Sequence, residues 1–146
     1  MFGLIQRVSS ASVRVDKRTT GQINQGIVLL LGIEKTDAAN QANRLLQKVL
    51  NYRIFSDNAD KINLSLCDIG GDLLVVSQFT LAADTQKGLR PSFSSAAPPA
   101  QAENLYDYFL TQAIALNKGN VESGLFGADM QVSLCNDGPV TFLLKS

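Results

Sequence analysis

The sequence predicts an α+β fold in which curved, largely antiparallel, barrel-like sheets are covered by two main helices. Three observations indicate this class: strand patterns follow one another in groups, two separate segments have the periodicity of amphipathic helices, and the order of elements implies few parallel crossovers. The 146 residues are a common length for one compact unit, so we expect a single domain over residues 1–146.

Two strands and a turn are expected at the beginning of the chain. Residues 4–8 and 12–16 each alternate apolar and polar side chains, and residues 17–21 are polar and favour a turn. Residues 26–33 follow as an almost wholly apolar run bounded by glycines, too short for a helix that buries all its faces. We therefore expect a central strand at 26–33, so that the first sheet is built from the early part of the chain.

The first helix is predicted after Thr36 and Asp37, either of which can cap a helix N-terminus. Apolar residues then recur at steps of three and four, which places them on one face of a helix that packs on the sheet. These positions are Ala38, Ala42, Leu45, Leu46, Val49 and Leu50.

The middle of the chain is predicted to return to strands. Residues 57–60 form a turn, and residues 61–67 alternate weakly, which favours a strand. A second turn at 70–72 precedes the strongly apolar strand 73–76. This strand delivers residues 77–81 at its far end.

A loop and a second helix follow. Residues 87–99 are rich in Gly, Pro, Ser and Ala and predict a loop. The helix is expected to begin near Pro98 and Pro99, because proline suits the first helical turn, and to end at 117–119. Its apolar face carries Ala102, Leu105, Phe109, Ala113 and Leu116.

Charge and composition limit the possible partners and locations. Lys plus Arg and Asp plus Glu both total 13, so a nucleic acid or another polyanion would need a local basic patch. Cys67 and Cys135 lack the spacing of metal ligands. Residues 1–8 alternate like a strand rather than a signal peptide, and no apolar run reaches the roughly 20 residues of a membrane span. We expect a soluble, cytoplasmic protein without a membrane partner.

The sequence contains no histidine, which removes whole classes of mechanism. A Ser-His-Asp triad, a Cys-His dyad, an HExxH zinc site and a His-ligated metal are impossible. The GxGxxG and GxxxxGKS/T patterns are also missing, so dinucleotide and P-loop sites lose their main support. We therefore expect no metal and no cofactor, and chemistry that uses hydroxyl, amide, carboxylate and backbone groups.

The first of two polar motifs follows the strand 73–76 and places Ser77, Gln78, Phe79 and Thr80 at its end. A threonine in such a position usually serves the β-structure or hydrogen-bonds a turn. Alternatively, Thr80 lies beside a substrate carbonyl, either as a hydrogen-bond donor or as a nucleophile without an obvious base. Both interpretations stay open at this point.

The second motif, Asn136-Asp137-Gly138-Pro139, joins two expected strands over 130–135 and 140–144. A Gly-Pro pair between strands is most often a tight turn. The sharper hypothesis is a cis peptide, which occurs in about 5–6% of X-Pro bonds and turns successive carbonyls in nearly the same direction. Two parallel carbonyls can bind an ammonium group.

Together with Gln6-Arg7-Val8 and Arg90-Pro91-Ser92-Phe93, the two motifs resemble those of D-aminoacyl-tRNA deacylase, the family of editing enzymes that hydrolyse D-amino acids from tRNA. The resemblance runs from the first strand to the last and includes residues 51–57 and 128–132. Two separated motifs in the right order make it specific.

This resemblance implies an ester hydrolase that acts on D-aminoacyl-tRNA and on glycine mischarged on alanine tRNA. It implies a homodimer in which Gly138 and Pro139 of one chain reach into the pocket of the other and leave no space for an L side chain. Asn136 and Phe93 are expected to help select the substrate, and Arg7 to support the Gly138-Pro139 loop. The residues implied in catalysis are Ser77, Gln78, Phe79 and Thr80.

Two mechanisms fit these residues. An aminoacyl ester is already activated, so it is sufficient to place water or the terminal ribose 2′-hydroxyl near the carbonyl and to stabilise the oxyanion with backbone N–H groups around residues 78–80. The alternative makes Thr80 a covalent nucleophile. A domain that binds aminoacyl-RNA ends without catalysis and a structural dimerisation module are the other classes, and the intact motifs favour the enzyme.

Contacts to the tRNA itself are expected outside the pocket. Scattered exposed cations are more often solvated surface than RNA ligands. An enzyme with little sequence-specific readout of RNA would suit many tRNAs. The candidate phosphate ligands are Arg14, Lys17, Arg18, Lys87 and Arg90.

Overall fold

The computed structural model describes residues 1–86 and 88–146, and it confirms the α+β class. The strands in this part of the chain are β1 (Phe2–Val15), β2 (Arg18–Ile23), β3 (Gly26–Gly32), β4 (Phe55–Ser56), β5 (Ile62–Leu64), β6 (Asp72–Ser77), β7 (Val121–Ser123) and β8 (Gln131–Lys145). The helices are α1 (Ala39–Asn51), α2 (Leu66–Ile69) and α3 (Pro99–Leu116), with a 3-10 turn η1 (Phe79–Ala82).

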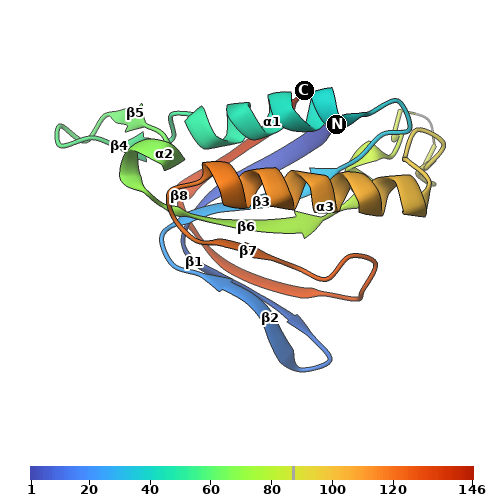
Figure 1. Cartoon of the computed structure of the whole chain (residues 1–146), viewed down its shortest axis with the longest axis horizontal. Coiled ribbons are helices and arrows are strands. Elements are labelled where there is room, and N and C mark those ends of the chain that lie inside the picture. The colour runs from blue at the N-terminus through green and yellow to red at the C-terminus, as the bar shows by residue number, and fades with distance from the viewer. Residues whose placement is uncertain (87) are drawn as a thin grey trace.

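A mixed sheet curves into a nearly closed, barrel-like shape, and α1 and α3 lie side by side over it (Figure 1). The order of neighbours is β2-β1-β3-β6-β7, with β8 on the other edge of β1. β4 and β5 form a separate two-stranded sheet. Most pairs are antiparallel, whereas β3–β6 and β6–β7 are parallel.

β1 is one long strand where two were expected. Its first half, Phe2–Val8, pairs with β3, its second half, Ala11–Val15, pairs with β2, and its other edge pairs with β8. The strand continues through the exposed Ser9 and Ser10 because Ser10 itself pairs with Cys135 of β8, so that only Ser9 is left out of the pairing. The shared strand β1 therefore joins three parts of the sheet.

The expected turn at 17–21 is wrong in its position. The chain reverses at Asp16 and Lys17, whose φ angles are 48° and 65°, and β2 already begins at Arg18. Two residues with positive φ match the tight turn that joins antiparallel strands. The threonines that follow them enter the strand, as β-branched residues favour.

β3 and β6 form the buried centre of the sheet. Ile27 and Leu29 on β3, and Leu73 and Val75 on β6, are fully buried. The two strands come so close at their beginning that a Cβ on Gly26 would lie 1.9 Å from the Asp72 carbonyl oxygen. Only glycine therefore fits at this point of the parallel pair.

The two long helices lie where the periodicity predicted them. α1 buries the apolar face from Ala42 to Leu50, while Ala38 is its N-cap residue. α3 begins at Pro99 and buries Tyr106, Phe109 and Ala113, whereas the predicted core residue Leu116 is 46% exposed. No helix in the described ranges has both the length and the apolar character needed to cross a membrane.

Two short elements differ from the prediction. The expected strand 61–67 ends at Leu64, because Ser65 and Asp68 cap α2: the Ser65 N–H donates to the Asp68 carboxylate at 2.9 Å, and the Asp68 N–H donates to Ser65 Oγ at 3.2 Å. The short strand β7, which pairs in parallel with β6, was not predicted, because three residues are too few to show a pattern.

β8 is also one strand, where two strands and a connecting turn were expected. The residues on either side of Asp137–Val140 pair with Gln6 and Val8, so this segment lies opposite Arg7 alone. The second motif is therefore a bulge within a long strand rather than a turn between two strands. The outer edge of β8 pairs with no strand of the described residues.

Candidate active site

The first motif lies where β6 ends and η1 begins. Ser77 is aligned with Leu31 of β3, and the Gln78 N–H donates to the Leu31 carbonyl at 2.8 Å. The chain then enters η1, which packs so closely on β3 that a Cβ on Gly32 would lie 2.8 Å from Leu81 Cβ. Glycine at position 32 thus lets the turn rest against the end of β3.

At the beginning of η1, two consecutive backbone N–H groups have no hydrogen-bond partner among the described residues. The Leu81 N–H donates to the Gln78 carbonyl at 3.2 Å, and the Ala83 N–H donates to the Thr80 carbonyl at 3.1 Å. Within the described residues, the N–H groups of Phe79 and Thr80 donate to no acceptor. The first N–H groups of a helical turn have no partner inside it, so they are available to a ligand.

A cavity of about 480 Å³ lies beside this motif. Ser77 and Gln78 contribute its polar side chains, and Phe79 is also part of its wall. The remainder is apolar or glycine and comes from the end of β3, the beginning of α3 and the segment that leads into β8. This apolar wall includes Leu31, Val76, Ala97, Phe126, Met130 and Val132. Its size and mixed lining suit a small organic group.

Thr80 lies outside this cavity. Its side chain is exposed, and Oγ1 accepts a hydrogen bond from Gln78 Nε2 at 2.6 Å. An amide N–H is a donor and cannot remove the hydroxyl proton. The predicted motif is therefore divided, because Ser77, Gln78 and Phe79 line the cavity whereas Thr80 does not.

An exposed aromatic pair stands next to the motif. The rings of Phe79 and Phe93 are 5.2 Å apart between centroids and tilted by 52°. Their exposed fractions are 60% and 43%. The backbone pairing of Asp84 with Ser92 returns the loop toward η1 and places Phe93 there. Phe93, predicted from the sequence as a substrate contact, is thus brought beside the first motif.

The second motif is held by two side chains. Asn136 Oδ1 accepts the Val140 N–H at 2.6 Å, which closes the bulge. Arg7 donates from Nε to the Asp137 carbonyl at 2.8 Å and from Nη1 to the Ile54 carbonyl at 2.6 Å. Arg7 therefore joins the bulge to the segment at Ile54 that follows α1.

Gly138 and Pro139 are exposed at this bulge, and the peptide between them is cis, as predicted. Gly138 has a φ of 140°, and a Cβ there would lie 2.6 Å from Val140 Cγ2 and 3.1 Å from Arg7 Nη2. Both the backbone conformation and the close neighbours favour glycine.

The two motifs do not meet within one chain. The bulge lies opposite Arg7 on β1, whereas Ser77 is aligned through Leu31 with Gly3, nearer the beginning of β1. β1 and β3 separate the strands that carry the two motifs. No residue of 136–139 lines the cavity described above.

The candidate tRNA contacts fall at two places. Arg14, Lys17 and Arg18 are exposed on the β1–β2 hairpin, which extends away from the helices (Figure 1). Arg14 Nη2 donates to the Lys17 carbonyl at 3.0 Å, so part of this cation is used to hold the turn. Arg90 is exposed in the loop that carries Phe93. Lys87 lies outside the described residues.

Tyr106 packs against Phe126, which lines the cavity. Its ring lies 5.6 Å from that of Phe126, and its hydroxyl donates to the Val75 carbonyl at 2.9 Å. Burial raises the pKa of Tyr106 to about 12, so this hydroxyl stays protonated near neutral pH. Its hydrogen bond to Val75 therefore joins α3 to β6.

Sequence reasoning missed much of the cavity wall. Ala96 and Ala97 belong to the expected loop, and Phe126, Gly127 and Ala128 belong to a segment without clear periodicity. A run of small residues directly before a helix is the one signal available, since small side chains leave space between elements. The sequence does not tell which other segment faces that space.

Comparison with solved structures defines the class of fold. The chain matches the c-Myc DNA Unwinding Element Binding Protein with a TM-score of 0.96 and 40% identity, over 100% of this chain and 99% of that chain. It matches a structure described as a probable eukaryotic D-amino acid tRNA deacylase with a TM-score of 0.82 and 17% identity, over 99% and 98% of the two chains. The second match shows a shared fold.

Sequence comparison gives the family. A family model described as D-Tyr-tRNA(Tyr) deacylase matches residues 4–145. Relatives named D-aminoacyl-tRNA deacylase are 65% identical over 144 residues in Pseudoalteromonas translucida and 61% identical over 145 residues in Cellvibrio japonicus, each over 99% of both chains. The chain belongs to the D-Tyr-tRNA(Tyr) deacylase family. The resemblance found in the sequence and the expectation of an enzyme are thereby confirmed.

Proposed function

We propose that this enzyme hydrolyses the ester bond of D-aminoacyl-tRNA and releases free tRNA and the D-amino acid. The observation that carries this proposal is a pair of N–H groups, of Phe79 and Thr80, that have no partner among the described residues and follow directly on Ser77 and Gln78 in the wall of a cavity of about 480 Å³, which Phe79 also lines. The names of the relatives supply the substrate class.

The free N–H groups are proposed to stabilise the oxyanion that forms when the ester carbonyl is attacked. They belong to a short turn fixed on β3, so they need no rearrangement during the reaction. The Gln78 N–H cannot act with them, because it already donates to the Leu31 carbonyl. A water molecule or the terminal ribose 2′-hydroxyl would attack the carbonyl, as an activated ester permits.

A covalent Thr80 nucleophile is the alternative mechanism. A hydroxyl needs a neighbouring base or a lowered pKa to attack an ester. The neighbour of Thr80 Oγ1 is a donating amide, and the side chain lies outside the cavity lining. These contacts favour attack by water or by the ribose hydroxyl.

The pocket is proposed to be completed by a second copy of the chain in a twofold dimer. The bulge with Gly138 and Pro139 is exposed and does not line the cavity of its own chain. The strand that carries it has an unpaired outer edge within the described residues and exposes Phe142 and Leu143 by 42% and 59%. Unpaired edges with apolar side chains are surfaces that other chains cover.

Substrate selection is proposed to work by exclusion. Gly138 and Pro139 of the partner subunit would form a backbone wall against the α-carbon of the substrate, with Asn136 holding the bulge and Phe93 beside the opening. An L side chain would meet this wall, whereas a D side chain or glycine would not. Glycine mischarged on alanine tRNA is therefore included among the proposed substrates.

The phosphate backbone of tRNA is proposed to contact exposed cations outside the pocket. Arg14, Lys17 and Arg18 are together on one hairpin, and Arg90 is on the loop beside the first motif. Phosphate contacts of this kind position an RNA without reading its sequence. One enzyme would then accept many tRNAs.

The test compares D-tyrosyl-tRNA with L-tyrosyl-tRNA, with and without EDTA, and measures the released amino acid. We expect rapid release from the D ester, little release from the L ester, and no effect of EDTA. Equal rates on the two esters would refute exclusion of the L side chain. Binding of both esters without release would indicate the non-catalytic RNA-binding module instead.

A further inference from the structure

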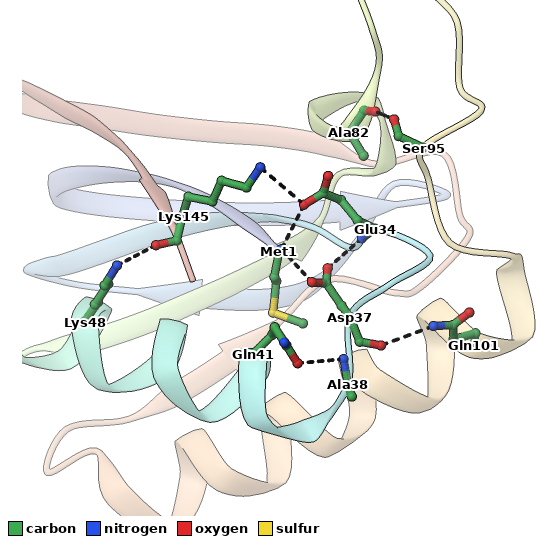
Figure 2. A network of polar contacts seen from close by, with 10 residues as sticks. All are labelled: Met1, Glu34, Asp37, Ala38, Gln41, Lys48, Ala82, Ser95, Gln101 and Lys145. Atoms are coloured by element: carbon green, nitrogen blue, oxygen red, sulfur yellow. Dashed lines mark hydrogen bonds and ion pairs between the residues drawn. The ribbon is translucent and has the colours of Figure 1, made fainter.

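The amino group of Met1 is buried and faces two carboxylates. Its nitrogen lies 2.7 Å from Asp37 Oδ1 and 3.1 Å from Glu34 Oε2 (Figure 2). Met1 is 1% exposed and Asp37 is 6% exposed. Charges removed from water in this way need partners of opposite charge. The ammonium and the two carboxylates therefore depend on one another.

Both carboxylates belong to the tight connection between β3 and α1. The Glu34 N–H donates to Asp37 Oδ2 at 2.7 Å, and the Asp37 N–H donates to the Glu34 carbonyl at 3.0 Å. Glu34 Oε2 also lies 3.8 Å from Lys145 Nζ, whose side chain is 61% exposed, whereas Asp37 forms no second ion pair within the described residues. Asp37 thus relies on Met1 for its neutralisation.

The same connection holds one wall of the candidate active site. The Lys35 N–H donates to the Ser95 carbonyl at 3.0 Å, and the Ala97 N–H donates to the Ile33 carbonyl at 3.0 Å. Ile33 and Ala97 both line the cavity. A displacement of the turn at 34–37 therefore moves the cavity wall.

Two side chains extend this link to η1 and α3. The Ser95 hydroxyl donates to the carbonyl of Ala82, the last residue of η1 (Figure 2). Gln101 of α3 donates from Nε2 to the Asp37 carbonyl at 3.2 Å. A continuous set of hydrogen bonds thus runs from the Met1 ammonium to the turn that carries Phe79 and Thr80.

We propose that the free, charged amino group of Met1 is a positioning group for the candidate active site. An N-acyl group, such as formyl, removes the positive charge and leaves Glu34 and Asp37 together without it. Residues added before Met1 move the ammonium out of its buried position. Both changes release the turn at 34–37 and loosen the segment 95–97.

Three forms of the full chain test this proposal: one with a free Met1, one with N-formyl-Met1, and one with Gly-Ser placed before Met1. Urea unfolding at neutral pH should show an unfolding equilibrium constant larger by on the order of 100-fold in both altered forms, as for other broken buried ion pairs. These measurements do not require the proposed reaction, so the failure of one proposal leaves the other intact.

Hydrogen exchange distinguishes positioning from a general loss of stability. In the altered forms, the N–H groups of Glu34, Lys35 and Ala97 should exchange faster by a larger factor than that of Val28 in the central strand. Equal factors at all four amides would refute the positioning role. Unchanged stability and exchange in the formylated protein would overturn the whole proposal.

The Glu34→Gln/Asp37→Asn variant is the matched control. It lacks the carboxylates that require the ammonium, so formylation removes a buried charge that has lost its partners and should not raise the unfolding equilibrium constant of this variant. A loss on formylation as large as in the parent chain would show that the formyl group acts by crowding and would refute the ion pairs as the cause.

Discussion

The Arg7 guanidinium donates from Nε to the backbone carbonyl of Asp137 at 2.8 Å, which joins two residues 130 positions apart in the chain. The same nitrogen lies 3.3 Å from the Asp137 carboxylate, and Nη1 holds the Ile54 carbonyl on the other side. One side chain thus connects the bulge of β8 with the strand region that follows α1. Binding both carbonyls at once requires the planar guanidinium group, which has several N–H donors.

Arg7→Lys should weaken both stability and catalysis, because a single ammonium cannot serve both carbonyls in this geometry. We expect the free energy of unfolding to fall by about 1.5–3 kcal/mol, the range for hydrogen bonds to charged groups. Urea unfolding and D-tyrosyl-tRNA hydrolysis measure the two effects. Arg53→Lys is the control, since Arg53 donates at 3.3 Å to the exposed Asn63. Parent-like behaviour of Arg7→Lys would contradict the bracing role.

Phe79→Pro should abolish one of the two proposed oxyanion donors, because proline has no N–H yet fits the first position of a helical turn. We expect kcat for the D ester to fall by about 10²–10³-fold relative to Phe79→Ala, which retains the N–H. Single-turnover kinetics with both variants measure this difference. Equal rates would exclude the Phe79 N–H as an oxyanion donor.

Thr80→Ala should retain activity within about tenfold of the parent, since one neutral hydrogen bond, worth about 0.5–1.5 kcal/mol, is the most that this exposed side chain can lose. Its backbone N–H is unchanged. Thr111→Ala on the exposed side of α3 serves as the control. Mass spectrometry of rapidly quenched enzyme provides a second check, and an acyl group attached to Thr80 would establish the covalent alternative.

Mixing two inactive variants should restore activity if the pocket combines two subunits. Phe79→Pro damages one half of the pocket and Gly138→Val damages the other, with an added folding cost of about 1–3 kcal/mol from the positive φ of Gly138. After joint refolding at equal amounts, about a quarter of the pockets would have both halves intact. Circular dichroism checks that each variant is folded. Absence of recovery from a folded mixture would contradict the shared pocket.

Protonation of Asp57 and Asp68 in acid should lower the free energy of unfolding. Hydrogen bonds from the N–H groups of Lys61 and Ala59 lower the pKa of Asp57 below its ordinary 3.8, and those from Ser65 lower the pKa of Asp68. Because these pKa values are lower in the folded state, their stabilisation is present above about pH 4 and is lost as the pH falls through the folded values.

Urea unfolding of Asp57→Asn and Asp68→Asn between pH 6 and pH 2 checks this expectation. Each variant should be less stable than the parent at pH 6, and the difference should shrink below about pH 4. Asn104→Gln, an exposed change that removes no carboxylate, is the control and should show a constant difference. A constant difference for the two test variants would show that their carboxylates do not drive the acid response.

Periodicity in the sequence was sufficient for the helices, because an amphipathic face such as Ala42 to Leu50 needs no knowledge of its partner. The bulge in β8 was not foreseen, because Gly138 and Pro139 have the local chemistry of a turn. Whether the strand continues past them is decided by β1 and by Arg7, which are distant in sequence. Tertiary pairing prevailed there over local preference.

The candidate site was predicted in part for the same reason. The residues of each motif could be selected from the sequence, and Phe93 does lie beside Phe79. That Thr80 lies outside the cavity, and that the Gln78 N–H is already engaged, depends on how η1 packs against Gly32 and Leu31. Such packing is a property of the assembled sheet, and spacing along the chain does not encode it.

The pairing of β1 with β8 also determines when this protein can finish folding. β8 begins only at Gln131, so the edge of β1 with which it pairs has no partner until the ribosome has made this late segment. The contact joins residues as distant in sequence as Phe2 and Lys145, and pairing over such separations is slow. The nascent chain therefore leaves this edge of β1 unpaired until β8 has left the ribosome, while the other edge can already pair with β2 and β3.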